Sequence, residues 1–371
     1  MVRTSMAVTP GRTHGGWPKS SVKRDGLRIG HLLRLFQGWK GSMARVSKPE
    51  VNRPPLPWGS FWIACAAVFL AAFVVLEILL RLAGDTPGLS NDAAYWALWR
   101  NKARHAEVST LVLTGTSRLQ QGFSPEGWHE FFPQHRVLQL SNENSSPVAV
   151  LEDLARDPAF RGQVLCEVAP SVCYHASIRR QQELVDEYRY RFNPVSVFLA
   201  SAKARLQERF CAANPSRSAR PYLKAVLLGH SFYPNFVTMK PDRNIRLDFK
   251  KKARKRPWLS KFERPLNHYV ENIGEARRDE AVQRLARAAE QIRRKGGKVV
   301  FLEYINSKDD AAKSFFWDVL MEKAESPGIY YKDDPELSRF ITPDGTHLDG
   351  RDVPAYTRRL AQIIRERGWL D

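Results

Sequence analysis

A serine that directly follows a short apolar segment is a candidate nucleophile. Residues 111–114 are apolar and β-branched, which predicts a buried strand, and Gly115-Thr116-Ser117 ends that strand. In an open α/β sheet, functional groups collect where a strand ends and a helix begins. Backbone N–H groups and the positive end of the helix dipole favour an oxyanion beside the Ser117 hydroxyl there. The competing interpretation is that Ser117 only caps the following helix.

An aspartate and a histidine near the other end of the chain are candidates for the matching base. Asp344 and His347 lie three residues apart in the turn 342–350. That spacing can place the carboxylate on the Nδ1 side of the imidazole, where it orients the ring and supports the imidazolium formed by proton transfer. The opposite ring nitrogen then faces a hydroxyl group. The alternative is a surface or capping histidine, with Asp344 as an N-cap.

Taken together, the Gly115-Thr116-Ser117 turn and the Asp344-Gly345-Thr346-His347 motif resemble the first and last sequence blocks of the SGNH or GDSL hydrolase superfamily. The resemblance covers roughly residues 111–367, without an internal insert. It is strongest to the membrane-anchored branch associated with acyl or acetyl groups on cell-envelope polymers. It implies a three-layer α/β/α sandwich with a mainly parallel, flavodoxin-like sheet. The implied roles are nucleophile for Ser117, general base and acid for His347, and orienting carboxylate for Asp344.

The chain departs from that family where oxyanion donors are expected. Thr116 replaces the acidic residue of the first block, and Ala169-Pro170-Ser171 stands where the family has Gly-x-Asn-Asp. The loop 142–147 takes the place of the second block. One lost donor costs on the order of 10²–10³ in turnover, so a non-enzymatic member of the fold is the alternative. Besides the Ser117 N–H, the candidate oxyanion or substrate-binding residues are Asn142, Asn144 and Ser171.

The segments between the two motifs predict an α/β sheet with parallel strands. Strand, loop and helix alternate, as they do in βαβ units. Gly296-Gly297 is expected to end the longest of these helices. Further strands are expected at 137–141, 164–168, 299–304 and 328–331, and helices at 148–155, 275–295 and 353–367.

Residues 175–275 interrupt this alternation and predict a helical insert that forms a lid or a small subdomain. Helices are expected at 179–191 and 195–210. The insert also carries the basic cluster Lys250–Arg256. This cluster is either a solvated charged turn or a surface for an anionic glycan or lipid headgroup.

An apolar run from Trp58 to Leu80, interrupted only by Glu77, is long enough to cross a bilayer as a helix. A secretory signal, a buried core helix and an interfacial helix fit its length and composition less well. Glu77 is expected to reach the interface or pair with Arg81. The expected organisation is a basic, disordered tail (1–57), a transmembrane helix (58–83), a connector (84–107) with Trp96 and Trp99 packed onto the domain, and an SGNH-like domain (108–371).

The positive charge of the chain is concentrated before the apolar run. The formal net charge is +19, and residues 1–57 hold eleven Lys and Arg against two acidic residues. The positive-inside rule then predicts a single-pass inner-membrane protein with a cytoplasmic N-terminus and a periplasmic main domain. Nucleic acid is not an expected partner there. The expected partners are the inner membrane, a cell-envelope polysaccharide or acyl-carrying substrate, and a multispanning acyltransferase or polymer-synthesis complex.

The cysteines and the implied chemistry predict neither a metal nor a diffusible cofactor. No Cys/His spacing is typical of a zinc site. Cys166 lies in a predicted strand, so Cys173 and Cys211 are the expected disulfide pair outside the cytoplasm. The sequence therefore predicts a membrane-anchored serine esterase or O-acyltransferase that acts on acyl or acetyl esters of cell-envelope glycans. The alternative is a degenerate SGNH-fold accessory protein that binds polysaccharide in a synthesis or export complex.

Overall fold

A computed structural model describes residues 58–169, 175–215, 236–249, 274–306 and 313–370. The expected tail, the basic cluster Lys250–Arg256, and the residues Ser171 and Cys173 lie outside these ranges. Residues 1–62 and 63–371 form separate units, and the elements described below belong to the second unit apart from the start of the first helix.

The centre of the second unit is a parallel five-stranded sheet with the strand order β2-β1-β3-β6-β7. Both β1 and β3 are buried at every position, as expected for strands covered on two faces. The order is that of a doubly wound sheet, in which the chain reverses direction at the first strand. The α/β class predicted from the sequence is confirmed. The strands are β1 (Thr110–Thr114), β2 (Arg136–Gln139), β3 (Gln163–Glu167), β6 (Lys298–Glu303) and β7 (Gly328–Tyr330).

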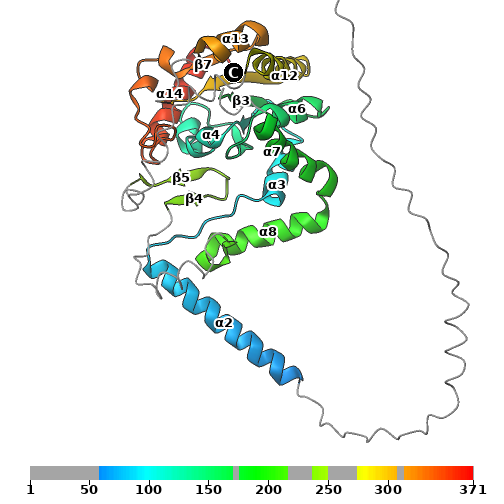
Figure 1. Cartoon of the computed structure of the whole chain (residues 1–371), viewed down its shortest axis with the longest axis vertical. Helices are drawn as coiled ribbons and strands as arrows, with labels where there is room; N and C mark the ends of the chain where they lie inside the picture. Colours follow the sequence, from blue (N-terminus) through cyan, green and yellow to red (C-terminus); the bar gives the residue numbers. More distant parts are fainter. Residues whose placement is uncertain (1–57, 170–174, 216–235, 250–273, 307–312, 371) are drawn as a thin grey trace, which may run out of the picture. The chain divides into compact units, whose positions relative to one another are not determined.

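Helices cover both faces of this sheet (Figure 1). Right-handed crossovers place the connection from β1 to β2 on one face of the sheet. The connections from β2 to β3, from β3 to β6 and from β6 to β7 run in the opposite direction and lie on the other face. On one face α5 packs against α14, and on the other α12 packs between α6 and α13. These helices are α4 (Ser117–Gln121), α5 (Pro125–His129), α6 (Val148–Arg156), α12 (Glu275–Arg294), α13 (Asp318–Ala324) and α14 (Val353–Glu366). Short helical turns complete the C-terminal part: η6 (Lys313–Trp317), η7 (Tyr331–Asp333) and η8 (Leu337–Arg339).

Helix α12 shows how the sequence pattern sets an element and its end. Its buried residues recur every three or four positions, from Ala281 to Ile292, so one stripe of the helix faces the sheet. Gly296 follows with φ +87, a left-handed conformation that glycine adopts without strain. The predicted end of this helix is therefore confirmed.

Helix α2 (Trp58–Leu82) is long and apolar enough to cross a membrane. Its apolar side chains are exposed, with Phe69 at 73% and Leu70 at 62%, so it is not a buried core helix. Near its end, Glu77 accepts a hydrogen bond from Arg81 Nε at 2.6 Å, which confirms the expected pair. The same carboxylate accepts the Ala212 N–H at 2.8 Å, in the insert.

The segment after α2 is held against the sheet by α3 (Ala93–Ala103). The Asp92 side chain caps this helix by accepting the Tyr95 N–H at 2.9 Å. Trp96 is fully buried and its indole N–H donates to Leu140 O at 2.9 Å. Trp99 is buried as well, so both tryptophans pack inward as predicted.

The insert is helical over much of its described length, as predicted, but it also contains a β-hairpin. Its helical elements are α7 (His175–Asp186), η2 (Glu187–Arg191), α8 (Pro194–Arg209) and η3 (Cys211–Ala213). The antiparallel hairpin of β4 (Val237–Met239) and β5 (Ile245–Leu247) was not predicted. Strands of three residues are too short to show an alternating pattern. Cys211 is buried, and its pairing with Cys173 stays a prediction.

Candidate active site

The structure brings together the serine, histidine and aspartate that the sequence singled out. Ser117 lies at the carboxyl end of β1, and His347 lies in the loop before α14, 230 residues later. The Ser117 Oγ is 3.0 Å from His347 Nε2. On the other side of the ring, His347 Nδ1 is 3.2 Å from Asp344 Oδ2. Ser117, His347 and Asp344 thus form a triad of hydroxyl, imidazole and orienting carboxylate in series.

A threonine inside the same turn fixes the tautomer of the imidazole. The Thr346 Oγ1 is 2.9 Å from His347 Nδ1 and donates its own proton to Asp344 Oδ1 at 3.1 Å. The hydroxyl oxygen is therefore an acceptor toward the ring, as is the carboxylate. Both partners favour a proton on Nδ1, which leaves the lone pair of Nε2 for the Ser117 hydroxyl.

The turn that carries His347 is shaped by the side chain of Asp344. Its Oδ1 accepts the backbone N–H groups of Thr346 at 3.1 Å and His347 at 2.9 Å. Such bonds between an aspartate and the backbone two or three residues on are typical of Asx turns. Gly345, with φ +82, supplies the left-handed residue that the turn needs. Local sequence thus places the carboxylate and the ring side by side.

Ser117 is the first residue of α4 and does not cap it. The N-cap is Thr116, whose Oγ1 accepts the Arg118 N–H at 3.1 Å. The capping interpretation of Ser117 is therefore wrong, and its hydroxyl is directed to His347. Ser117 is only partly buried, so a substrate can approach it.

A buried ion pair holds the turn that presents Ser117. The Glu167 side chain, at the end of β3, is fully buried. Its carboxylate accepts the Thr116 N–H at 2.5 Å and pairs with the Arg118 guanidinium at 2.7 Å. A side chain at position 115 would come within 2.6 Å of Glu167 Oε2, so only glycine fits against this carboxylate. Arg118 also reaches Glu303, at the end of β6, at 3.4 Å.

The three predicted oxyanion residues have different outcomes. Asn142 lies against the serine turn, because its N–H donates to Gly115 O at 3.2 Å. Its side-chain Nδ2 donates to Ser145 Oγ at 3.2 Å, which uses one of two N–H groups. Asn144 is exposed, with φ +50, and no described contact joins it to the triad. Ser171 lies outside the described residues. The Ser117 N–H has no acceptor within the described parts of the chain and is a second donor.

The unpredicted hairpin helps to hold Asn142. Arg243, in the hairpin turn, is fully buried and donates to Gln139 O at 3.1 Å and Ser141 O at 3.3 Å. It also donates to Asn91 Oδ1 at 3.0 Å, and Asn91 Nδ2 donates to Asn142 Oδ1 at 2.8 Å. Burial lowers the pKa of Arg243 to about 10, so the side chain stays charged at neutral pH. This chain of contacts turns the donor end of the Asn142 amide away from Asn91.

Four positioning residues were missed in the sequence: Thr346, Glu167, Arg118 and Arg243. Glu167 had a readable signal, because a charged residue at the end of a buried strand must find a partner. The other three gave no signal, because their partners come from segments far away in the sequence or from the detailed shape of a turn.

A pocket of about 390 Å³ lies on the flank of α4. Gln121, at the end of α4, lines it together with Asn244 of the hairpin and Arg351, which follows the histidine loop. Two buried amide atoms, Gln121 Oε1 and Asn244 Nδ2, have no hydrogen-bond partner among the described residues. Both atoms are closed to solvent, and the lining also carries charged side chains, such as Lys240 and Arg351. In the described parts of the chain, no group of three or more His, Cys, Asp or Glu side chains is placed to hold a metal ion.

Comparisons with known proteins give likenesses to solved structures alone. No family model matches the chain, and no curated protein matches it. The chain is similar to a solved structure described as "Crystal Structure of TesA", with 12% sequence identity and a TM-score of 0.33. The match covers 69% of this chain and 98% of that one.

Replacing Glu167 with glutamine should destabilise the fold far more than breaking an exposed ion pair. Glu167→Gln leaves Arg118 buried without its main counter-charge, which costs about 3–5 kcal/mol. The matched control is Glu130→Gln, because Glu130 pairs with Arg358 at the surface, at 2.6 Å. Removal of that exposed pair should cost far less, because solvent and salt screen it. Denaturant unfolding of the full chain in nonionic detergent measures both, and equal losses would contradict the role assigned to Glu167.

The loop that carries His347 should become less stable in acid because of Asp349. Arg351 donates to the Asp349 carboxylate and lowers the pKa of that group below its ordinary value of 3.8. Burial raises the pKa, whereas the backbone N–H groups of Arg351 and Phe249 lower it further. A pKa below the unfolded value means that the stabilisation is complete above the unfolded pKa and is lost as the pH falls through the folded pKa.

We therefore expect Asp349→Asn to cost about 1 kcal/mol at neutral pH, since Arg351 is half-exposed. The difference from the wild type should be complete well above pH 3.8 and should shrink as the pH falls below 3.8 toward the lowered pKa of Asp349. Unfolding curves recorded across this pH range measure it. A difference that stays constant with pH would show that the ionised carboxylate does not provide the stabilisation.

Proposed function

We propose that this protein is a membrane-anchored serine esterase or O-acyltransferase that acts on acyl or acetyl esters of cell-envelope glycans outside the cytoplasm. The observation that carries the proposal is the contact of 3.0 Å between Ser117 Oγ and His347 Nε2, with Asp344 and Thr346 behind the ring. A hydroxyl beside an oriented imidazole is the arrangement that activates a serine nucleophile.

In the first half of the reaction, His347 Nε2 takes the proton of Ser117 as Oγ attacks the ester carbonyl carbon. The tetrahedral oxyanion forms beside the Ser117 N–H and the second N–H of Asn142 Nδ2, which are the donors available there. The imidazolium then gives its proton to the leaving sugar oxygen, the C–O bond breaks, and the acyl group stays on Ser117 as an ester. Asp344 stabilises the imidazolium while it exists.

In the second half, an incoming hydroxyl attacks the acyl-enzyme and gives its proton to His347. Water as the acceptor gives hydrolysis and a free acid, whereas a sugar hydroxyl gives acyl transfer. Ser117 recovers its proton from the imidazolium in both cases. A transferase would need an acyl donor, which a multispanning membrane partner would supply.

Two features support an envelope glycan as the substrate and the membrane as the location. The pocket beside α4 is lined by polar residues, among them Gln121 and Asn244, and amide side chains suit sugar hydroxyl groups. Helix α2 has the length and composition of a membrane anchor, and the basic residues before it favour a cytoplasmic N-terminus. The domain after α2 would then face the envelope polymers.

The second candidate is an inactive member of this fold that binds polysaccharide within a synthesis or export complex. The exposed position of Asn144 favours it, because this residue takes the place of a glycine donor in the family that the sequence resembles. Fewer donors would leave the oxyanion poorly stabilised. Binding of a glycan would still use the pocket beside α4.

A fluorophosphonate probe tests the nucleophile. We expect it to label the full chain, purified in nonionic detergent, on Ser117, because the activated Oγ displaces fluoride from phosphorus. Labelling should disappear in Ser117→Ala and slow by about 10³ or more in His347→Ala. Ser338→Ala, which removes an exposed serine elsewhere, should label like the wild type. Absence of labelling in a folded wild-type chain would favour the accessory protein.

A second experiment tests the glycan pocket separately. Gln121→Ala removes an amide that the proposal assigns to sugar hydroxyls and leaves Ser117 and His347 in place. The KM for acetylated oligosaccharides should rise about fivefold, the loss expected for one hydrogen bond. Hydrolysis of p-nitrophenyl acetate, which has no sugar, should keep its kcat/KM. An equal loss on both substrates would indicate a disturbed triad rather than a sugar subsite.

A further inference from the structure

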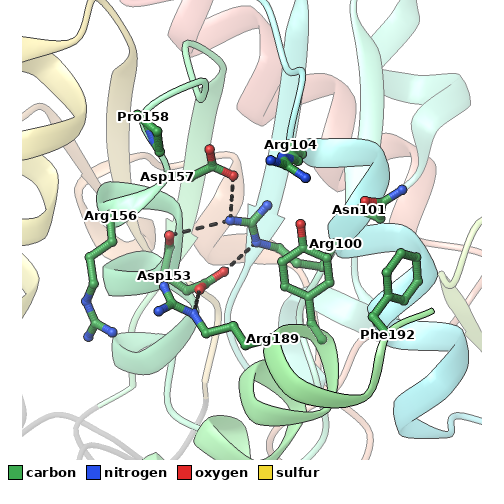
Figure 2. Close-up of a pocket in the computed structure, with 10 residues that line it drawn as sticks. Arg100, Asn101, Arg104, Asp153, Arg156, Asp157, Pro158, Arg189 and Phe192 are labelled. Atoms are coloured by element: carbon green, nitrogen blue, oxygen red, sulfur yellow. Dashed lines mark hydrogen bonds and ion pairs between the residues drawn. The ribbon is translucent and has the colours of Figure 1, made fainter.

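A second pocket, of about 400 Å³, lies around Arg100 and Asp153 (Figure 2). Its walls come from the ends of α3 and α6 and from η2 in the insert. Helix α6 ends at Arg156 and β3 begins at Gln163, so the pocket lies where the parallel strands start. Ser117, in contrast, lies where they end. The two sites are therefore on opposite edges of one sheet.

The pocket is rich in arginine, and both of its carboxylates already form ion pairs. Asp153 pairs with Arg100 and Arg189, each at 2.6 Å, and Asp157 pairs with Arg100 at 3.1 Å. The exposed Arg104 forms no ion pair with any residue that the structure describes. Arg156 pairs with Glu152, outside the pocket lining, at 3.0 Å. With Arg156 balanced by Glu152, three guanidinium groups face two carboxylates, and the unbalanced positive charge lies at Arg104.

Arg100 has a buried hydrogen-bond donor without an acceptor. Its side chain is 1% exposed, yet Nη1 has no hydrogen-bond partner among the described residues. The Nε and Nη2 atoms are held by Asp153 and Asp157, so the fork cannot turn to find an acceptor for Nη1. In Figure 2 this third nitrogen points away from both carboxylates and toward Arg104. A buried N–H donor without an acceptor is unfavourable, and an anion seated between the two guanidinium groups would supply the acceptor.

We propose that this pocket binds a phosphate group, with Arg100 and Arg104 as its principal ligands. A phosphate monoester carries about −1.5 to −2 charges at neutral pH, so it interacts more strongly than a carboxylate with the uncompensated Arg104 and the unpartnered Nη1 of Arg100. Guanidinium groups bind phosphate oxygens with paired N–H donors. The exposed Arg104 changes rotamer to admit the ligand, since Nη1 of Arg100 is closed to solvent beforehand. The half-buried Tyr188 and Phe192 provide an apolar wall for the group that carries the phosphate.

The phosphate could belong to a soluble metabolite or to a lipid headgroup, and one pair of ligands distinguishes the two. Glycerol 3-phosphate and dioctanoyl phosphatidic acid share a phosphate monoester and differ in the acyl chains. Equal affinity would identify a soluble phosphate as the ligand. Much tighter binding of the lipid, still dependent on Arg104, would identify a lipid headgroup. Both results require the arginine site.

Thermal unfolding of the full chain in nonionic detergent, followed by tryptophan fluorescence, measures binding of inorganic phosphate and of these two ligands. We expect saturable stabilisation by phosphate but not by chloride at the same ionic strength. Arg104→Gln should weaken phosphate binding about tenfold or more, and Arg104→Lys should restore part of it. The matched control Arg277→Gln removes an exposed arginine of α12 and should bind like the wild type.

Arg104→Gln should fold normally, because the residue is exposed and has no ion pair in the described parts of the chain. Its circular dichroism spectrum and its unfolding temperature without ligand check this. Equal phosphate affinity in Arg104→Gln and Arg277→Gln would overturn the proposal, as would the absence of any saturable effect in the wild type. Labelling of Ser117 by the fluorophosphonate is independent of either result.

Discussion

The buried carboxylate of Glu167 is the constraint on which the geometry of the site depends. A fully buried charge is tolerated only when other groups compensate it, and here the compensation comes from the residues on both sides of Ser117. Thr116 supplies a backbone N–H and Arg118 supplies a guanidinium. The start of α4 is therefore fixed relative to the end of β3. Ser117 projects from this turn because its neighbours are fixed there.

Three layers of contacts surround the triad, and each comes from a different distance along the chain. Local contacts within residues 344–347 set the imidazole beside its carboxylate. Pairing of β1 with β3 brings Glu167 under the serine turn. The hairpin and the start of α3 then hold Asn142 through Arg243 and Asn91. The insert thus contributes to the site through Arg243, which binds the backbone carbonyls just before Asn142.

The sequence predicted those parts of the molecule that are encoded locally. Apolar runs identified β1, β3 and β6, and apolar residues that recur every three or four positions identified α12. Ser117, Asp344 and His347 were found because each lies in a short motif whose shape its neighbours determine. The hairpin was missed because its strands are too short for a pattern. Arg243 was missed because its role depends on a fold that brings residue 243 to residue 139.

Asn144 shows that the position of a loop can be predicted correctly while the residue that contacts the site is not. The loop after β2 does lie beside the serine turn, because the Asn142 N–H binds Gly115 O. The left-handed conformation at Asn144 and its exposure leave it without a contact to the triad. The residue of this loop that contacts the serine turn is therefore Asn142, two residues before the position that corresponds to the family's glycine. Spacing in the sequence identifies a loop more reliably than it identifies which side chain points inward.

Helix α3 runs between the two edges of the sheet, and Arg100 fixes its position by ion pairs. Its end is fixed by the ion pairs of Arg100 with Asp153 and Asp157. Just before its start, Asn91 bonds to Arg243 and Asn142. An eleven-residue helix is about 16 Å long and close to rigid over that length. The buried pairs at one edge therefore help to place Asn91, and through it Asn142, at the other edge.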